Sequence, residues 1–156
     1  MNIFEPTLDM ICIDDIAHSL SHQCRFGGHL PTFFSVAQHS VMTSKRVPQE
    51  HKLAALLHDA SEAYLMDIPR PIKAHLTNYK ELEDRLMELI ALKFGFEYPL
   101  HPIVKKADEF MLRWEWHSLM LRDDTWGGIT PALYYKAKWD FMYHSTQLTE
   151  AETVAA

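Results

Sequence analysis

Apolar side chains recur along most of this chain at the three- and four-residue spacing of amphipathic helices, and no segment of useful length alternates as a strand does. The strongest pattern runs from about residue 48 to 65. Its apolar positions fall on one predicted helical face: Leu53, Leu56, Leu57, Ala60 and Tyr64. Pro48 suits a first helical position, whereas Pro69 and Pro71 stop a helix because proline lacks an amide hydrogen. Segment 67–73 is therefore predicted to be a rigid loop.

Further segments share the helical spacing, from about residues 15 to 22, 36 to 46, 79 to 94, 103 to 122 and 131 to 147. Ser35 and Gln38 form a capping-box pattern before the segment that begins at residue 36, and Gly95 is a typical helix end. The predicted fold class is all-α: a single compact domain of about six helices over residues 1–148. Residues 149–156 have no apolar anchor, and we expect a flexible tail there.

The composition is that of a globular protein, since 47% of the 156 residues are hydrophobic and 23% are charged. A formal net charge of −6 argues against a nucleic-acid polymer as partner, because phosphate neutralisation needs a basic face. A few local cations still suffice for a small phosphorylated ligand. The two cysteines are too few for a disulfide scaffold. With no leader pattern and no membrane-length apolar run, we expect no membrane partner and a cytoplasmic location.

Two imidazoles and two carboxylates stand at positions that favour a metal site. His39 lies in the first turns of one predicted helix, and the adjacent pair His58 and Asp59 lies in the next. A very short turn joins these helices as an antiparallel hairpin, which can bring His39 opposite His58. Asp108 stands among apolar neighbours, where a carboxylate needs a counter-charge or a metal. Such a donor set suits a divalent ion such as Mn, Fe, Co, Ni or Zn.

Acidic and basic residues accompany this set. Glu62 follows His58 by four residues and shares its predicted helical face, so it either faces the ion or is a solvated helix acid. Asp67 is either a second acid of the site or a cap of the loop. Arg25 and Phe26 precede a Gly-Gly turn, where an arginine can hold a phosphate and an aromatic ring can stack on a sugar or base. A surface cation beside a core aromatic is the alternative.

The order of His, His-Asp and Asp on successive helices resembles the HD-domain metal-dependent phosphohydrolases. The resemblance covers nearly the whole chain and is carried by DIAHSLSHQCRFGGH, FFSVAQHSV, LLHDASEAYLMDIPRPIK and KADEFMLRWE. It is especially close to the small 5′-deoxynucleotidases and the phage dATP triphosphohydrolases. The extended match around HDASEAYLMDIPRPIK is the most specific part of it.

This resemblance implies one divalent transition-metal ion, Zn, Mn, Co, Fe or Ni, with four ligands: His39, His58, Asp59 and Asp108. It implies that Glu62 and Asp67 position or activate the attacking water. Arg25 matches the phosphate-binding arginine of the family. Phe26 stands where the 5′-deoxynucleotidases have a tryptophan that packs on deoxyribose.

The resemblance also implies that Lys73 and Lys105 contact the phosphate chain. Because Arg25 and Arg70 add two further cations, more than one phosphate needs, the expected activity is a dNTP triphosphohydrolase that releases triphosphate, with dATP as favoured substrate. The first alternative is a 5′-deoxynucleotidase that removes phosphate from dNMPs. The second is a non-catalytic nucleotide-binding module.

We expect a small deoxynucleotide as the partner molecule. The last helix is rich in aromatic residues, and together with the resemblance it predicts a homo-oligomer. The expected location is the cytoplasm, or the host cytoplasm for a phage-encoded chain.

Overall fold

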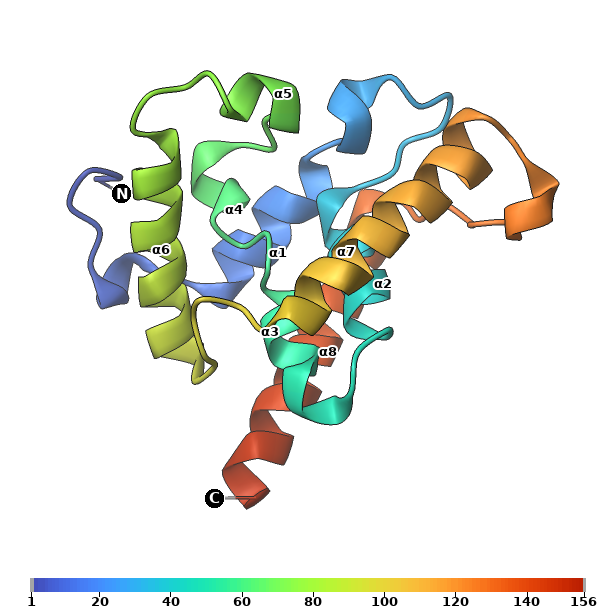
Figure 1. The fold of residues 1–156 in the computed structure, drawn as a ribbon. Helices are drawn as coiled ribbons and strands as arrows, with labels where there is room; N and C mark the ends of the chain where they lie inside the picture. Colours follow the sequence, from blue (N-terminus) through green and yellow to red (C-terminus); the bar gives the residue numbers. More distant parts are fainter. Residues whose placement is uncertain (1, 156) are drawn as a thin grey trace.

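The computed structural model describes the backbone of residues 2–155 and the side chains of residues 2–69 and 71–150. In this part of the chain the fold is all-α, with one isolated bridge between Cys24 and Ser35 in place of any strand. The α-helices (Figure 1) are α1 Ile13–His22, α2 Val36–Ser44, α3 Lys52–Leu56, α4 Glu62–Leu65, α5 Arg70–Lys73, α6 Tyr79–Phe94, α7 Pro102–Glu115 and α8 Tyr134–Ala155. Short 3-10 turns cover Leu8–Met10, Arg25–Gly28, Gln49–His51 and Asp124–Trp126, and a π-helical turn covers Trp116–Met120.

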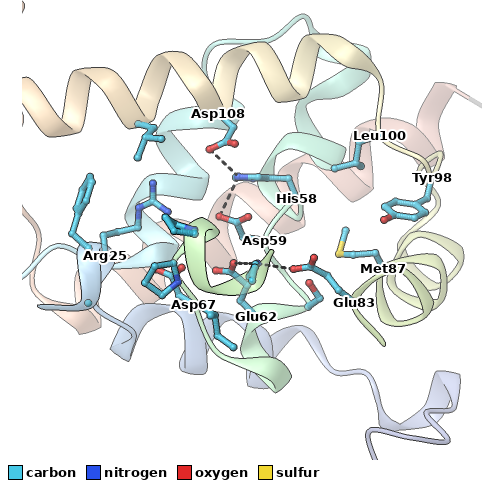
Figure 2. Close-up of a pocket in the computed structure, with 18 residues that line it drawn as sticks. Arg25, His58, Asp59, Glu62, Asp67, Glu83, Met87, Tyr98, Leu100 and Asp108 are labelled. Atoms are coloured by element: carbon cyan, nitrogen blue, oxygen red, sulfur yellow. Dashed lines mark hydrogen bonds and ion pairs between the residues drawn. The ribbon is translucent and has the colours of Figure 1, made fainter. Parts of the chain in front are cut away.

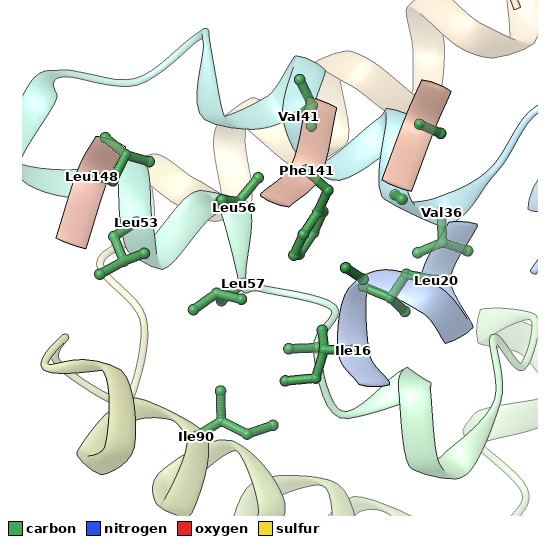
Figure 3. Close-up of a cluster of buried hydrophobic side chains, with 14 of the residues drawn as sticks. Ile16, Leu20, Val36, Val41, Leu53, Leu56, Leu57, Ile90, Phe141 and Leu148 are labelled. Atoms are coloured by element: carbon green, nitrogen blue, oxygen red, sulfur yellow. The ribbon is translucent and has the colours of Figure 1, made fainter. Parts of the chain in front are cut away.

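The main core lies where α1, α2, α3 and α8 meet, with α6 closing one side (Figure 3). Its largest members are fully buried: Ile16, Leu20, Leu53, Leu56, Leu57, Ile90 and Phe141. Helix α7 packs on α2 and crosses the bundle beside this core (Figure 1). The core therefore holds α2 and the turn that follows α3 in place. Helix α7 is positioned relative to both because it packs on α2.

Two helix boundaries follow the sequence signals closely. The hydroxyl of Ser35 accepts a hydrogen bond from the backbone N–H of Gln38 at 3.1 Å, which confirms the predicted cap of α2. Gly95 ends α6 with a φ of +82°, a conformation that glycine adopts without steric cost. Local chemistry thus sets these ends in the way that the sequence predicts.

The helix predicted over residues 48–65 is broken, and this is a correction. The helical conformation stops at Leu57 and resumes at Glu62, so α3 and α4 replace one long helix. The imidazole Nδ1 of His58 lies 2.8 Å from the carbonyl oxygen of Ala55, which in a continuous helix accepts the N–H of Asp59. A side chain thereby takes a backbone acceptor, and the helix ends in a series of tight turns.

One further correction, together with the break between α3 and α4, explains why there are eight α-helices among the described residues and not about six. The segment 67–73, expected to be a loop, contains the short helix α5, because the carbonyl of Pro69 accepts hydrogen bonds from Ile72 and Lys73 while Pro71 needs no donor in the first turn. Helix α8 continues to Ala155, so the backbone of 149–155 is helical where a flexible tail was expected. The side chains from residue 151 onward lie outside the described residues.

No helix within the described residues has both the length and the apolar character that crossing a bilayer requires.

Candidate metal centre

The four residues expected to bind a metal meet at one point. The two Nε2 atoms of His39 and His58 lie 3.3 Å apart, and the atoms of His39, His58 and Asp59 that can bind an ion lie within 4.8 Å of one another. Asp108 Oδ1 lies 3.3 Å from His39 Nε2 and 3.9 Å from His58 Nε2. Figure 2 shows His58, Asp59 and Asp108 pointing toward one another. The cluster thus combines side chains from helix α2, from the turn after α3 and from helix α7.

Both imidazoles are oriented by hydrogen bonds on their far side. Nδ1 of His58 donates to the backbone oxygen of Ala55 at 2.8 Å, and Nδ1 of His39 donates to the carboxylate of Glu115 at 2.5 Å. Since Nδ1 carries the hydrogen when either ring is neutral, the Nε2 atom of each neutral ring presents a lone pair to the cluster. Two lone pairs and two carboxylates then converge without a donor among them. Such a group of acceptors needs a shared proton or a cation.

The spacing of the cluster fits a divalent ion. Ligand atoms about 2.1 Å from a tetrahedral ion are about 3.4 Å apart. The distance between the two Nε2 atoms and four distances between an Nε2 atom and a carboxylate oxygen of the cluster range from 3.2 to 3.9 Å. His39, His58 and Asp59, with Asp108 as a fourth ligand, therefore have the chemistry and the separations to hold a transition-metal ion.

The pKa values report the same excess of negative charge. Burial lowers the pKa of His58, but the carboxylate of Asp59 and the charge of Asp108 outweigh it and raise the pKa to about 9. Burial raises the pKa of Asp108, but the hydrogen bond with His39 and the charge of His58 bring it down to about 2. The protein groups alone therefore attract a positive charge into the cluster.

A cavity of about 520 Å³ opens beside the cluster. His58, Asp59 and Asp108 line it, whereas the fully buried His39 lies behind them. Figure 2 places Arg25 toward one end of the cavity and an apolar group toward the other, made of Met87, Tyr98 and Leu100. The volume suits a small molecule such as a nucleotide.

Glu62 stands at the edge of this cavity with one oxygen available. Its Oε1 accepts a hydrogen bond from Lys73 Nζ at 2.9 Å, while its buried Oε2 has no hydrogen-bond partner among the described residues. Burial raises the pKa of Glu62 to about 8, and the nearby carboxylates of Asp59 and Asp67 add to this effect. Although Glu62 begins α4 and does not share a helix with His58, both line the cavity.

Asp67 also lines the cavity, and Gln23 fixes the segment that carries it. The side chain of Gln23 donates to the backbone oxygen of Glu62 and accepts from the backbone N–H of Asp67, each at 2.9 Å. One glutamine from the end of α1 thus ties the two acids to the bundle. The sequence offered no signal for this role, because a glutamine after a helix is common.

Arg25 and Phe26 form one wall of the cavity. The backbone N–H of Arg25 donates to Phe34 at 2.9 Å, and Phe26 and Gly27 have φ values of +54° and +59°. This tight turn brings the Phe26 ring beside Trp116, with ring centres 5.8 Å apart. The Arg25 side chain is 10% exposed, so Arg25 is not the surface cation of the alternative that the sequence left open.

Comparison with known proteins finds two relatives whose names call them uncharacterized. YfdR of Escherichia coli K12 is 48% identical over 125 residues, which cover 80% of this chain and 68% of YfdR. RCAP_rcc00048 of Rhodobacter capsulatus is 36% identical over 117 residues, which cover 69% of this chain and 60% of that protein.

The chain belongs to the YfdR family. No family model matches it. Because neither relative's name states an activity, the function of this member of the YfdR family has to be argued from its site.

The two lysines expected to contact phosphate differ in position. Lys73 lines the cavity, where its ammonium group lies 2.9 Å from Glu62 and 2.7 Å from Glu83. Lys105 is exposed on α7, one turn before Asp108, and is not among the residues that line the cavity. The side chain of Arg70 lies outside the described residues.

In this YfdR-family chain, sequence reasoning missed Glu115. Glu115 is fully buried and accepts hydrogen bonds from both His39 and Arg25. The available signal was its spacing from Asp108: seven residues is two helical turns, which puts both carboxylates on one face of α7.

Proposed function

We propose that this chain is an HD-type metal-dependent phosphohydrolase of 2′-deoxynucleotides. The observation that carries the proposal is the convergence of four groups able to bind a metal, three of which line a nucleotide-sized cavity together with the buried Arg25. A bound divalent ion supplies a Lewis acid that lowers the pKa of water and polarises a phosphoryl oxygen. His39, His58, Asp59 and Asp108 are the residues that would hold it.

The remaining residues have separate tasks in this proposal. Arg25 binds the phosphate oxygens, and Phe26 packs on the deoxyribose. In its ionised form Glu62 accepts the proton of the attacking water at Oε2, which has no hydrogen-bond partner among the described residues, and Asp67 orients that water. The new bond joins the water oxygen to phosphorus, the P–O5′ bond breaks, and the deoxynucleoside oxygen takes up a proton. The products are a deoxynucleoside and a free phosphate species.

The length of the phosphate chain is the next question. Four cations counted in the sequence favoured a triphosphate. Among the described side chains, two cations line the cavity, Arg25 and Lys73, and Lys73 is already paired with Glu62 and Glu83. These two cations can hold a single phosphate, which makes 5′-deoxynucleotidase activity on dNMPs our first candidate. The sequence resemblance supports the second candidate, a dATP triphosphohydrolase.

The test is to incubate the purified chain with dAMP, dATP and their ribonucleotide counterparts, each with added Mn²⁺, Co²⁺ or Zn²⁺, and to identify the phosphate species released. Orthophosphate from dAMP supports the first candidate, and inorganic triphosphate from dATP supports the second. Equal rates on the ribonucleotides would remove the proposed role of Phe26. No product with any of the metals would contradict the enzyme and leave a non-catalytic binding module.

We also propose that the chain forms a homo-oligomer through α8. Tyr135, Trp139 and Tyr143 follow one another at four-residue spacing, and they are 61%, 64% and 50% exposed. Lys136 and Asp140 lie on one side of this aromatic stripe. An antiparallel second copy of α8 would therefore bring each lysine near the partner's aspartate while the stripes pack together.

A further inference from the structure

The carboxylate of Glu115 joins two residues that come from different elements. Its Oε1 accepts a hydrogen bond from His39 Nδ1 at 2.5 Å, and its Oε2 accepts from Arg25 at 3.0 and 3.3 Å. The Glu115 side chain is 0% exposed. A buried carboxylate is costly unless its charge is balanced and its oxygens are bonded. Both conditions hold here, with one oxygen for each partner.

The bond to His39 decides what that histidine can bind. Because Glu115 accepts from Nδ1, the hydrogen of the neutral ring stays there and the lone pair of Nε2 faces the cluster. A carboxylate in this position also increases the electron density of the ring, which strengthens its bond to a metal. Without the carboxylate, His39 is free to take the other tautomer and to rotate.

The bond to Arg25 decides where its positive charge points. Glu115 engages the Nε edge of the guanidinium and leaves the remaining N–H groups for an anion in the cavity. Arg25 also lies in the electrostatic field of Asp59 and Asp67. If Glu115 lost its charge, Arg25 would turn toward these carboxylates. It would then compete with a metal for Asp59 and withdraw from phosphate.

We propose that Glu115 is a positioning residue that sets both the metal affinity and the phosphate affinity of the site, through one carboxylate shared by His39 and Arg25. This inference rests on the proposed function for the identity of the two ligands. Its test uses binding of Co²⁺ and of inorganic phosphate and needs no turnover. Failure of the hydrolysis assay and failure of this inference are therefore separate results.

The decisive variant is Glu115→Gln, which keeps the shape but has one accepting oxygen where two are needed. Calorimetric titration of the chain should show that the Kd for Co²⁺ rises by about tenfold or more. At saturating Co²⁺, the Kd for inorganic phosphate should rise by about tenfold as well. Met111→Leu is the matched control, since Met111 is also fully buried on α7 and the change conserves volume. Both Kd values should stay at wild-type level in that control.

A double-mutant cycle separates positioning from general damage. In an Arg25→Met background, Glu115→Gln should cause no further loss of phosphate binding, because its effect on phosphate runs through Arg25. A loss of Co²⁺ affinity should persist in that background, because the part of the effect that runs through His39 remains when Arg25 can no longer compete for Asp59. Additive losses of phosphate binding would overturn the proposal, and so would wild-type affinities in Glu115→Gln.

Circular dichroism establishes that each variant is folded. If Glu115→Gln does not fold, Glu115→Asp replaces it, because aspartate keeps the charge but is too short to reach both partners. At least one of the two Kd values should then rise by about tenfold. Wild-type values for both ligands in Glu115→Asp would overturn the proposal.

Discussion

Oε2 of Glu62 is a buried carboxylate oxygen without a hydrogen-bond partner among the described residues, and it borders the cavity. Native proteins rarely leave such an atom unsatisfied, which makes a role toward water or ligand its best explanation. We predict that Glu62→Ala lowers turnover of the best deoxynucleotide by at least about a thousandfold, while metal content stays near one ion per chain. Rate assays and elemental analysis of the same sample measure both.

Glu83→Ala is the comparison for that variant. Glu83 pairs with the same lysine, Lys73, but it has no buried side-chain oxygen that lacks a hydrogen-bond partner among the described residues. We expect Glu83→Ala to lower turnover by less than about tenfold. If Glu62→Ala retained wild-type rates, or if the two variants lost activity equally, Glu62 would have no special part in the reaction.

The raised pKa of His58 predicts a pH dependence of metal binding. With a pKa of about 9, this imidazole is protonated at pH 7, and it must lose the proton before Nε2 can bind an ion. Raising the pH removes the proton, so metal affinity should increase by about tenfold per pH unit below pH 9. The carboxylate of Asp108, with its lowered pKa, stays ionised throughout.

Calorimetric titration with Co²⁺ between about pH 6.5 and 8.5, in two buffers of different ionisation enthalpy, measures this dependence and the proton released. The prediction is wrong if affinity does not change with pH and no proton is released.

At the scale of elements, the glutamine that ties α1 to the segment carrying Glu62 and Asp67 is the main support of the acids. Gln23→Leu removes both hydrogen bonds of that side chain to the backbone and leaves the N–H of Asp67 unsatisfied. We predict a loss of about 1–3 kcal/mol in the free energy of unfolding and a fall in turnover of at least about tenfold. Urea denaturation and rate assays test the two effects.

Gln38 provides a matched control, because its side chain also makes two hydrogen bonds to the backbone, at a place away from the cavity. Its side chain donates to Thr130 and accepts from Ala132, each at 2.8 Å. Gln38→Leu should lower stability to a similar extent and leave turnover unchanged. Equal loss of turnover in both variants would show that stability alone explains the Gln23 effect.

The sequence predicted those parts of the structure that depend on periodicity and local chemistry. The cap at Ser35, the end at Gly95 and the convergence of His39 with His58 all follow from spacing. The break after α3 does not, because Leu57 and Ala60 remain buried in the turn and the apolar pattern continues across it. A histidine that competes for a backbone carbonyl leaves no trace in hydrophobic periodicity.

The same reason explains what was missed in the site. The roles of Gln23 and Glu115 depend on partners distant in the sequence, at Asp67, His39 and Arg25. Neither residue type is unusual at its position, and only the packing of α7 on α2 and the end of α1 near α4 bring the partners together. The resemblance predicted which residues form the site. The structure adds the hydrogen bonds that orient those residues.

At the scale of the whole molecule, the aromatic stripe of α8 predicts self-association. Trp139→Glu puts a charge in the middle of the stripe, next to Tyr135 and Tyr143, and should convert an oligomer into an 18.2 kDa monomer. Light scattering during size-exclusion chromatography measures the mass. Leu92→Glu is the control, because Leu92 on α6 is 68% exposed but stands outside the stripe. A wild-type chain that is already monomeric would refute the proposed role of α8.

The origin of the candidate ligands in three separate segments has a consequence for the life of the protein in a cell. An ion bound to His39, His58, Asp59 and Asp108 would act as a removable cross-link between α2, the turn after α3, and α7. At a free-ion concentration one hundred times the Kd, such a ligand stabilises the native state by about 2.7 kcal/mol. The supply of the metal would then govern how often the chain opens to proteases, in addition to whether its chemistry proceeds.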